Sequence, residues 1–196
     1  MNKELIDKVR KYCKEVMKSS RCMKLPFHNW QHTLDVVENA ELIARNENLS
    51  EDIIEELIIA SYFHDLGNVQ GSTGHEKRSC EYAREFLTDQ DYSDQHILNI
   101  LYNIKATEMP QQPNTIAEKV ICDADLAHLG KENYMRKNKA LRLEWEKFND
   151  TSFGEVEWIG MNIAFLSQHS FHTDFAKEYY RSVKLENIKK LEQELQ

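Results

Sequence analysis

The segment from Ile53 to Phe63 constrains the fold more than any other part of the sequence. It reads IIEELIIASYF, and at about 100° per residue its apolar side chains point to nearly all sides of a helix. A helix of this kind is stable in water only when other elements surround it. We therefore predict a central helix that begins after the N-cap residue Ser50 and ends at residues 64–67.

Helix-period apolar patterns occupy most of the remaining chain, which contains only three prolines and six glycines. We predict an all-α bundle of about eight or nine helices, in which residues 1–130 form the core and the helices of 131–196 pack on the same domain. Besides the central helix, the expected helices span about 2–19, 29–46, 75–88, 91 or 93 to 105, and 115–129, with three more after residue 131.

Composition excludes several classes of partner. The formal net charge is −8 and no basic cluster stands out, so a nucleic-acid polymer is not an expected partner. No apolar stretch approaches the roughly 20 residues that span a bilayer, and the first twenty residues lack the apolar centre of a secretory signal, so we expect a cytoplasmic protein without a membrane partner. The four cysteines are widely spaced and are predicted to be reduced packing residues.

Histidines and aspartates at three separate points are the candidates for chemistry. His64 and Asp65 end the central helix, His32 lies on the buried face of the preceding helix, and either Asp123 or Asp125 lies near the end of the sixth. Two imidazoles with two carboxylates suit manganese, iron, magnesium, nickel or zinc without selecting among them. A lone buried histidine is more often a core residue than a ligand, so the proposal requires these side chains to meet around one divalent cation.

The sequence around these residues resembles a known family. FHNWQHT at 27–33, YFHDLG at 62–67 and CDADL at 122–126 are similar, in that order, to the H…HD…D signature of the HD superfamily of metal-dependent phosphohydrolases. This resemblance implies an HD-type helical fold in which His32, His64, Asp65 and Asp125 hold the metal. It favours Asp125 over Asp123, a choice that helical geometry leaves open, and it makes Asp65 a catalytic residue.

His28 is a candidate general acid. HNWQH at 28–32 is similar to the HNxxH element of cyclic-nucleotide phosphodiesterases, in which the first histidine is the acid. That resemblance implies that His28 protonates the leaving oxygen. The alternative is a capping or loop contact.

Positions at which this chain differs from other members of the family bear on the number of metals and on the substrate contacts. Dinuclear members resemble this chain at His75 but carry a further histidine where it has Ala106, so we expect one metal and regard a second as less favoured. His75 then contacts substrate, orders water or caps a helix. Arg78 and Lys105 are further candidates for binding phosphate, although a solvated helix face also explains them.

The expected activity is hydrolysis of a phosphomonoester or phosphodiester of a small substrate, a nucleotide in particular, by a metal-activated water. An HD-type mixed-valent diiron oxygenase and a non-catalytic metal-binding or nucleotide-binding regulatory domain are the alternatives, and a homo-oligomer is compatible with the sequence. Substrate selection is expected from loops 68–74 and 107–113 and from the final helices. The aromatic side chains of those helices are predicted to belong to the core: Trp145, Trp158, Phe171 and Tyr179.

Overall fold

A computed structural model describes residues 1–149 and 151–195, and in this part of the chain the regular secondary structure is entirely helical. The nine α-helices found there confirm the predicted all-α class. In chain order, with three short 3-10 helices, the elements are α1 (Lys3–Lys18), η1 (Arg21–Lys24), α2 (Trp30–Asn46), α3 (Glu51–Phe63), η2 (Leu66–Val69), α4 (His75–Asp89), α5 (Asp94–Ala106), α6 (Ile116–Asp125), η3 (Leu126–Gly130), α7 (Tyr134–Phe148), α8 (Glu155–Gln168) and α9 (Asp174–Glu194).

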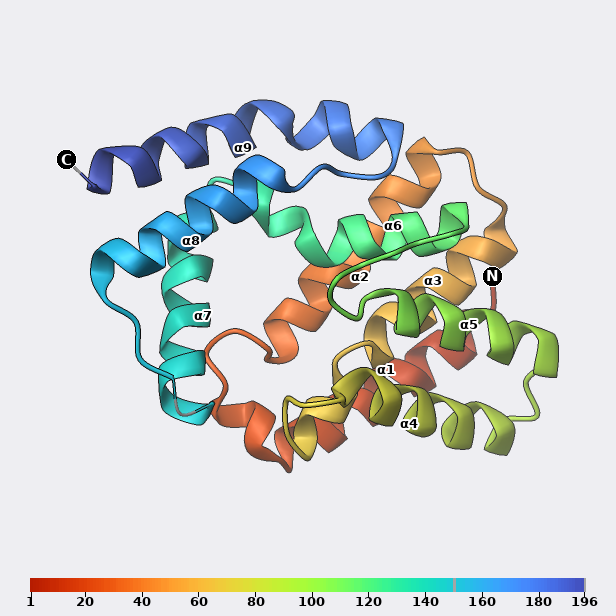
Figure 1. The fold of residues 1–196 in the computed structure, drawn as a ribbon. Coiled ribbons are helices and arrows are strands. Elements are labelled where there is room, and N and C mark those ends of the chain that lie inside the picture. The colour runs from red at the N-terminus through yellow and green to blue at the C-terminus, as the bar shows by residue number, and fades with distance from the viewer. Residues whose placement is uncertain (150, 196) are drawn as a thin grey trace.

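Helix α3 is the centre of the bundle, as its all-round apolar sequence predicts. Helices α1, α2, α4, α5 and α6 all pack against it, and the residues from Ile54 to Phe63 are buried (Figure 1). The two glutamates in this buried run have partners: Glu55 accepts a hydrogen bond from the Tyr92 hydroxyl at 2.7 Å, and Glu56 accepts hydrogen bonds from His96 and Asn99 at 2.6 and 2.9 Å. Central packing fixes the C-terminal end of α3 and therefore the positions of the residues that follow it.

The N-termini of α2 and α3 are set by local capping. The Asn29 side chain accepts hydrogen bonds from the backbone N–H groups of Gln31 and His32, and the Ser50 hydroxyl accepts one from Ile53. Capping by Asn29 therefore fixes the first turn of α2, which carries His32.

The sixth helix differs from its prediction. The α-helical geometry ends at Asp125, and residues 126–130 form the tighter η3. Contacts with α9 explain the change: Asn187 donates to the carbonyl oxygen of Leu129 at 3.0 Å, and Gly130 lies so close to Tyr180 that a Cβ atom there would clash. Tertiary contacts thus reshape the turn next to the candidate ligand Asp125.

The C-terminal helices attach to one another and to this turn. Helix α7 approaches the rest of the backbone chiefly through η3, and α9 packs against η3, α8 and α2 (Figure 1). The four cysteines are free thiols and all but Cys80 are buried, which agrees with a packing role.

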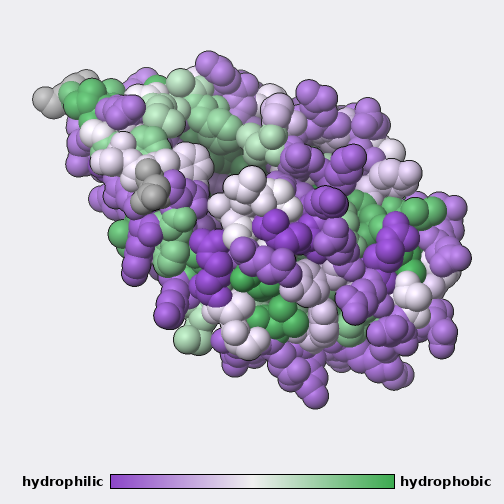
Figure 2. Space-filling model, turned by 60° about the horizontal axis from the view of Figure 1, so that its bottom comes forward, coloured by the Kyte–Doolittle hydropathy of each residue, from purple (hydrophilic) through white to green (hydrophobic). Residues whose placement is uncertain are grey.

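Hydrophilic side chains dominate the molecular face in Figure 2, with hydrophobic patches between them. None of the helices in the described ranges combines the length and the apolar character that a bilayer span requires.

Candidate metal centre

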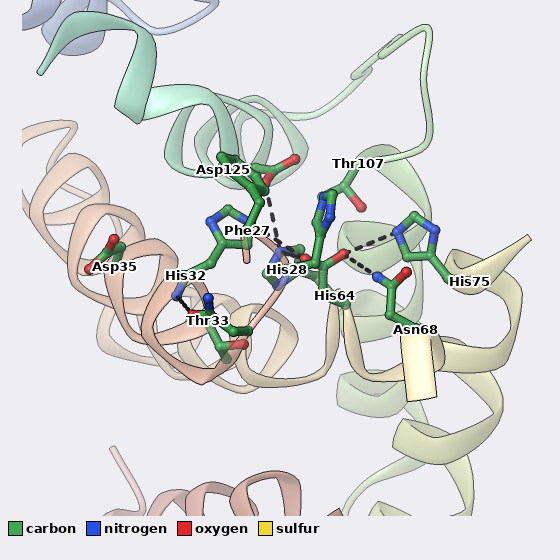
Figure 3. A network of polar contacts seen from close by, with 12 residues as sticks. Phe27, His28, His32, Thr33, Asp35, His64, Asn68, His75, Thr107 and Asp125 are labelled. Atoms are coloured by element: carbon green, nitrogen blue, oxygen red, sulfur yellow. Dashed lines mark hydrogen bonds and ion pairs between the residues drawn. The ribbon is translucent and has the colours of Figure 1, made fainter. Parts of the chain in front are cut away.

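Four side chains from three parts of the chain converge on one point. His32 comes from α2, His64 and Asp65 follow the last turn of α3, and Asp125 ends α6; Figure 3 shows the labelled members facing one another. His32 Nε2 lies 3.4 Å from Asp65 Oδ2 and 3.2 Å from Asp125 Oδ1. His64 Nε2 lies 3.3 and 3.7 Å from the same two oxygens. The convergence that the sequence proposal requires is present.

The atoms that face this point lack hydrogen-bond partners. His32 Nε2, His64 Nε2 and Asp65 Oδ2 are buried without a hydrogen-bonding partner among the residues described. His64 is oriented by its other ring nitrogen, because Nδ1 lies 2.8 Å from the carbonyl oxygen of Ser61 and can donate to it, which leaves Nε2 as a lone-pair donor when the ring is neutral. Unpaired buried polar atoms are costly, and a bound cation would satisfy all three.

The spacing of these atoms fits a common metal ion. Ligands that lie about 2.0–2.2 Å from one ion are separated from each other by roughly 3.0–3.6 Å in tetrahedral or octahedral geometry. Three of the distances above, 3.2–3.4 Å, lie in this range and the fourth, 3.7 Å, is just above it, and the donor atoms of His32, His64 and Asp125 all fall within 4.8 Å of one another. The residues present therefore fit a single divalent cation.

The electrostatics favour positive charge at the same point. Burial alone would lower the pKa of His64, but the carboxylates of Asp65 and Asp125 outweigh it and raise that pKa to about 9. For Asp65, burial would raise the pKa, yet the neighbouring histidines hold it well below its ordinary value. Burial dominates at His32 and lowers its pKa, which keeps this ring neutral and able to donate a lone pair.

The second oxygen of Asp65 is held by two other side chains. Asp65 Oδ1 lies 3.0 Å from His75 Nε2 and accepts a hydrogen bond from Asn68 Nδ2 at 3.1 Å (Figure 3). The His75 ring also reaches the carbonyl oxygen of Ser72 through Nδ1 at 2.8 Å. His75 thus orients Asp65. His75 also lines the neighbouring cavity, and its contact with substrate stays a prediction.

The two aspartates of the DAD sequence have different surroundings. Asp123 is fully buried, and its carboxylate accepts hydrogen bonds from the backbone N–H groups of His172 and Thr173 at 2.7 and 2.8 Å and from the Thr173 hydroxyl at 2.7 Å. Asp123 therefore anchors the start of α9, whereas Asp125 faces the histidine cluster. The structure places Asp125 at the candidate metal centre, as the family resemblance implies.

His28 lies beside this cluster and is paired with Glu144 of α7. Glu144 is buried and accepts hydrogen bonds from the backbone N–H groups of Phe27 and His28, while its other oxygen lies 2.5 Å from His28 Nδ1. Burial would lower the pKa of His28, but the carboxylates of Asp65 and Glu144 raise it to about 9. The ring is therefore protonated at neutral pH, and its Nδ1 atom is occupied by Glu144.

A cavity of about 460 Å³ opens next to the metal centre, within the range of small-molecule sites. Asp65 and Asp125 are among its lining residues, and residues along η3, α7 and α8 form most of the wall, which is largely apolar. Trp158 and Phe171 are buried, as predicted, and Trp158 also lines the cavity together with the partly buried Trp145. The prediction that Tyr179 belongs to the core is wrong, because its side chain lies on an exposed face of α9.

Arg78 has a different role from the one predicted. Its guanidinium donates hydrogen bonds to three backbone carbonyl oxygens of η2 and of the loop that follows it: Gly67 and Thr73, at 3.0 and 2.9 Å, and Gly71. Its donors are thus directed at the loop, and Arg78 does not line the cavity described above. It fixes the loop between η2 and α4 instead of presenting charge to a substrate.

Lys105 is also separated from the site. It is exposed near the end of α5 and lines a different surface hollow, together with Tyr102 and Glu118. The helical turn places its side chain outside the cavity next to the metal centre, although Thr107 and Met109, just beyond it, do line that cavity. Loop 107–113 therefore contributes to the site as predicted, but through other residues than Lys105.

Two residues near the metal centre, Glu144 and His128, were not predicted from the sequence. Glu144 lies in an amphipathic helix far from any recognised motif, so no sequence signal marked it. His128 follows Asp125 by three residues, a spacing that shares one helix face, and that signal was available. Its Nδ1 atom lies 3.2 Å from the Asp125 carbonyl oxygen, and burial lowers its pKa to about 3, so it stays neutral.

Comparisons with known proteins agree with this geometry. No curated protein matches the chain. Among solved structures, the chain is similar to a predicted HD superfamily hydrolase from an uncultured Thermotogales bacterium, at 20% identity and a TM-score of 0.65, covering 97% of this chain and 92% of that one. It is also similar to Bacillus subtilis YpgQ, solved in complex with ADP, at 17% identity and a TM-score of 0.69, covering 97% and 95%.

These two likenesses establish the fold. The family model of the HD domain matches residues 29–130, more than half of the chain and a range that contains all four converging side chains. The chain belongs to the HD domain family.

Proposed function

We propose that this protein is a metal-dependent phosphohydrolase that cleaves a phosphomonoester or phosphodiester of a small substrate, with nucleotides as the substrate class. The observation that carries the proposal is the set of buried, unpaired donor atoms from His32, His64 and Asp65 that face one another and Asp125. Such an arrangement is costly in a purely structural core and is what a cation-binding site requires.

His32, His64, Asp65 and Asp125 would hold one divalent cation. A cation bound there lowers the pKa of a coordinated water from about 16 to about 7 and polarises a phosphoryl oxygen. Asn68 and His75 hold the remaining oxygen of Asp65, so this ligand is oriented before the cation arrives. Ala106 offers no ligand atom, which supports one metal over two.

His28 is the proposed general acid. Its ring is one-quarter exposed, lies near that of His32 and lines the cavity. Glu144 holds Nδ1, which leaves Nε2 to carry the proton that a departing alkoxide needs. The Glu144 carboxylate, which lies outside the metal cluster, favours the protonated form of this ring.

The charge of the cavity favours a substrate with few phosphate groups. Among the described residues, no lysine or arginine lines it, and its titratable members are three histidines and three carboxylates: His28, His75, His128, Asp65, Glu76 and Asp125. Lys131 and Lys137 line a different small hollow, which shares Asp125 and His128 with this cavity. Phosphate charge must therefore be balanced by the cation and the histidines. The ADP complex of YpgQ, a protein of the same fold, supports the nucleotide class.

The experiment that tests this proposal measures metal content and phosphate release together. The purified protein is analysed for bound metals, then assayed with manganese, magnesium, iron, nickel or zinc against nucleoside mono-, di- and triphosphates and cyclic nucleotides. We expect metal-dependent hydrolysis that a chelator abolishes and that metal restores. Hydrolysis that is unaffected by complete metal removal would contradict the proposal, as would a product formed only with oxygen and without phosphate release.

A further inference from the structure

A network of side-chain amides occupies the wall of the cavity formed by α7 and α8. Asn138 Nδ2 donates to the Tyr134 hydroxyl at 3.1 Å and to Asn162 Oδ1 at 2.5 Å, and the Tyr134 hydroxyl donates to the same Asn162 oxygen at 3.2 Å. Trp158 Nε1 donates to Asn138 Oδ1 at 2.8 Å, and Asn162 Nδ2 donates to the Trp158 carbonyl oxygen at 2.8 Å. All four residues line the cavity.

The direction of every hydrogen bond in this network is fixed. The Trp158 indole N–H can only donate, so the Asn138 atom that it contacts must be the amide oxygen. The Asn138 amide nitrogen then uses both hydrogens within the network, and Asn162 must present its oxygen to them. The Asn162 orientation follows without ambiguity because its nitrogen faces a backbone carbonyl.

Two groups of this hydrogen-bond network remain available to a ligand. Asn162 Nδ2 has one N–H that the network does not use, and Asn138 Oδ1 has one free lone pair. Two side chains in direct contact on this wall therefore offer a donor, from Asn162, and an acceptor, from Asn138, among mainly apolar neighbours. Together they match the edge of a planar ring that carries an adjacent acceptor and donor.

The walls around the two amides fit such a ring. Leu141, Trp145, Met161 and Phe165 line the same cavity, which has room for a ring and a sugar but is too small for a polymer. A charged group would have no counter-ion on this wall, since none of its described lining residues from α7 and α8 is ionisable at neutral pH. The occupant is thus uncharged at this end, aromatic and capable of hydrogen bonding.

We propose that Asn138 and Asn162 are specificity-determining residues that bind the heteroaromatic ring of the substrate through a paired donor and acceptor, in the manner of a nucleobase edge. This inference rests on the proposed function only for the phosphate-bearing end of the substrate, because binding of the ring does not require hydrolysis. A site built to hydrogen-bond a substrate rejects analogues that lack the group, so these two amides select the substrate.

The first test compares two substrates that share a phosphate and a sugar. The metal-loaded protein is assayed with a panel of nucleoside 5′-monophosphates and with ribose 5-phosphate, which lacks the ring. We expect kcat/KM for the preferred nucleotide to exceed that for ribose 5-phosphate, and Asn162→Leu to reduce this ratio at least about 10-fold. The ratio does not depend on the folded fraction, because both substrates report the same molecules. An unchanged ratio would overturn the inference.

A second variant and a control sharpen this test. Asn162→Asp keeps the shape but replaces the free N–H by a carboxylate oxygen, and we expect it to reduce the ratio as well. Lys139→Ala changes an exposed residue on α7 and should keep the wild-type ratio. A lower ratio in the Lys139 variant would show that the assay reports general damage and would count against the inference.

A binding measurement separates this inference from the proposed function. The four common nucleosides, which carry no phosphate, are titrated into the metal-loaded protein while the fluorescence of Trp145 and Trp158 is followed. Binding that is lost in Asn162→Leu supports the ring site even if no phosphate is ever released, in which case only the proposed function fails. Phosphate release without any dependence on the ring or on Asn162 would sustain the hydrolase and refute the ring site.

Discussion

The metal centre and the α7–α8 wall face the same cavity but are built in different ways. At the candidate metal centre, His64 and Asp65 are oriented by neighbours within about ten residues of chain: His64 by Ser61, and Asp65 by Asn68 and His75. On the α7–α8 wall, Asn138 is oriented by Trp158, twenty residues away on another helix. Local sequence therefore fixes how His64 and Asp65 are oriented, and docking of α2 and α6 then completes the cluster, whereas the hydrogen bond that orients Asn138 forms only when α7 and α8 dock.

This difference predicts how the two regions respond to change. Substitutions at the metal centre should remove the bound cation and abolish hydrolysis, so that turnover can no longer report a substrate preference. Substitutions on the wall should alter preference and leave the cation bound. The four predictions that follow are ordered from the largest expected effect to the smallest.

Replacing Asp65 by alanine should have the largest effect. It removes a ligand and leaves the His64 and His75 rings without their shared carboxylate. We expect loss of bound metal and a decrease in phosphate release of at least about 1,000-fold, since a positioned cation supplies both nucleophile and charge stabilisation. Metal analysis and steady-state kinetics measure this. Asp174→Ala, an exposed carboxylate far from the cluster in sequence, is the control and should behave as wild type.

Replacing His28 by asparagine should separate acid catalysis from metal binding. We expect kcat to fall about 100-fold or more, the usual contribution of a general acid, with the metal content unchanged. A substrate with a leaving group that needs no proton, such as a nitrophenyl ester, should lose much less. Equal losses on both substrates, or loss of the metal, would contradict the acid role.

The DAD sequence offers a matched pair of variants. Asp123→Ala removes the acceptor for three hydrogen bonds at the start of α9, and we expect the free energy of unfolding to fall by about 2–3 kcal/mol with the metal retained. Asp125→Ala should lose the metal instead. Urea unfolding and metal analysis of both variants test this. If the two substitutions changed the metal content and the free energy of unfolding in the same way, the two aspartates would not have these different roles.

Replacing Glu144 by glutamine should have the smallest effect, and one that depends on pH. Because Asp65 and Glu144 together raise the folded pKa of His28 from 6.5 to about 9, their interaction with His28 stabilises the fold fully below pH 6.5 and is lost as pH rises through 9. The Glu144 pKa is lowered, despite burial, by its contact with His28, so its contribution is present above pH 4.5 and is lost as pH falls below that value. The destabilisation, about 1 kcal/mol, should therefore be greatest between pH 4.5 and 6.5.

Unfolding free energies of wild type and Glu144→Gln, measured at pH 6 and pH 9.5 with a chelator present, check this sign. The chelator removes the separate pH dependence of metal binding. A difference between the two proteins that is constant with pH would show that His28 and Glu144 do not titrate as a pair.

Much of the fold was predictable because its signals are local. The apolar run of α3, the Asn29 and Ser50 caps, and the few glycines and prolines each act within a few residues, so the sequence alone indicated the helices and their order. The end of the sixth helix was not predictable, because α9 shapes η3 through Asn187 and Tyr180. Helix boundaries that depend on distant residues leave no local pattern.

The candidate site divides in the same way. The amino-acid sequence by itself indicated the candidate metal-binding residues, because His32, His64, Asp65 and Asp125 stand in short motifs that resemble the H…HD…D signature of the HD superfamily. Only the tertiary structure decided that Arg78 binds a loop, that Lys105 lies outside the cavity, and that Glu144 and the Asn138–Asn162 pair lie inside the site or on its wall. The physical reason is that these roles depend on which side chains distant helices bring within a few ångströms, and no periodicity along one helix records that.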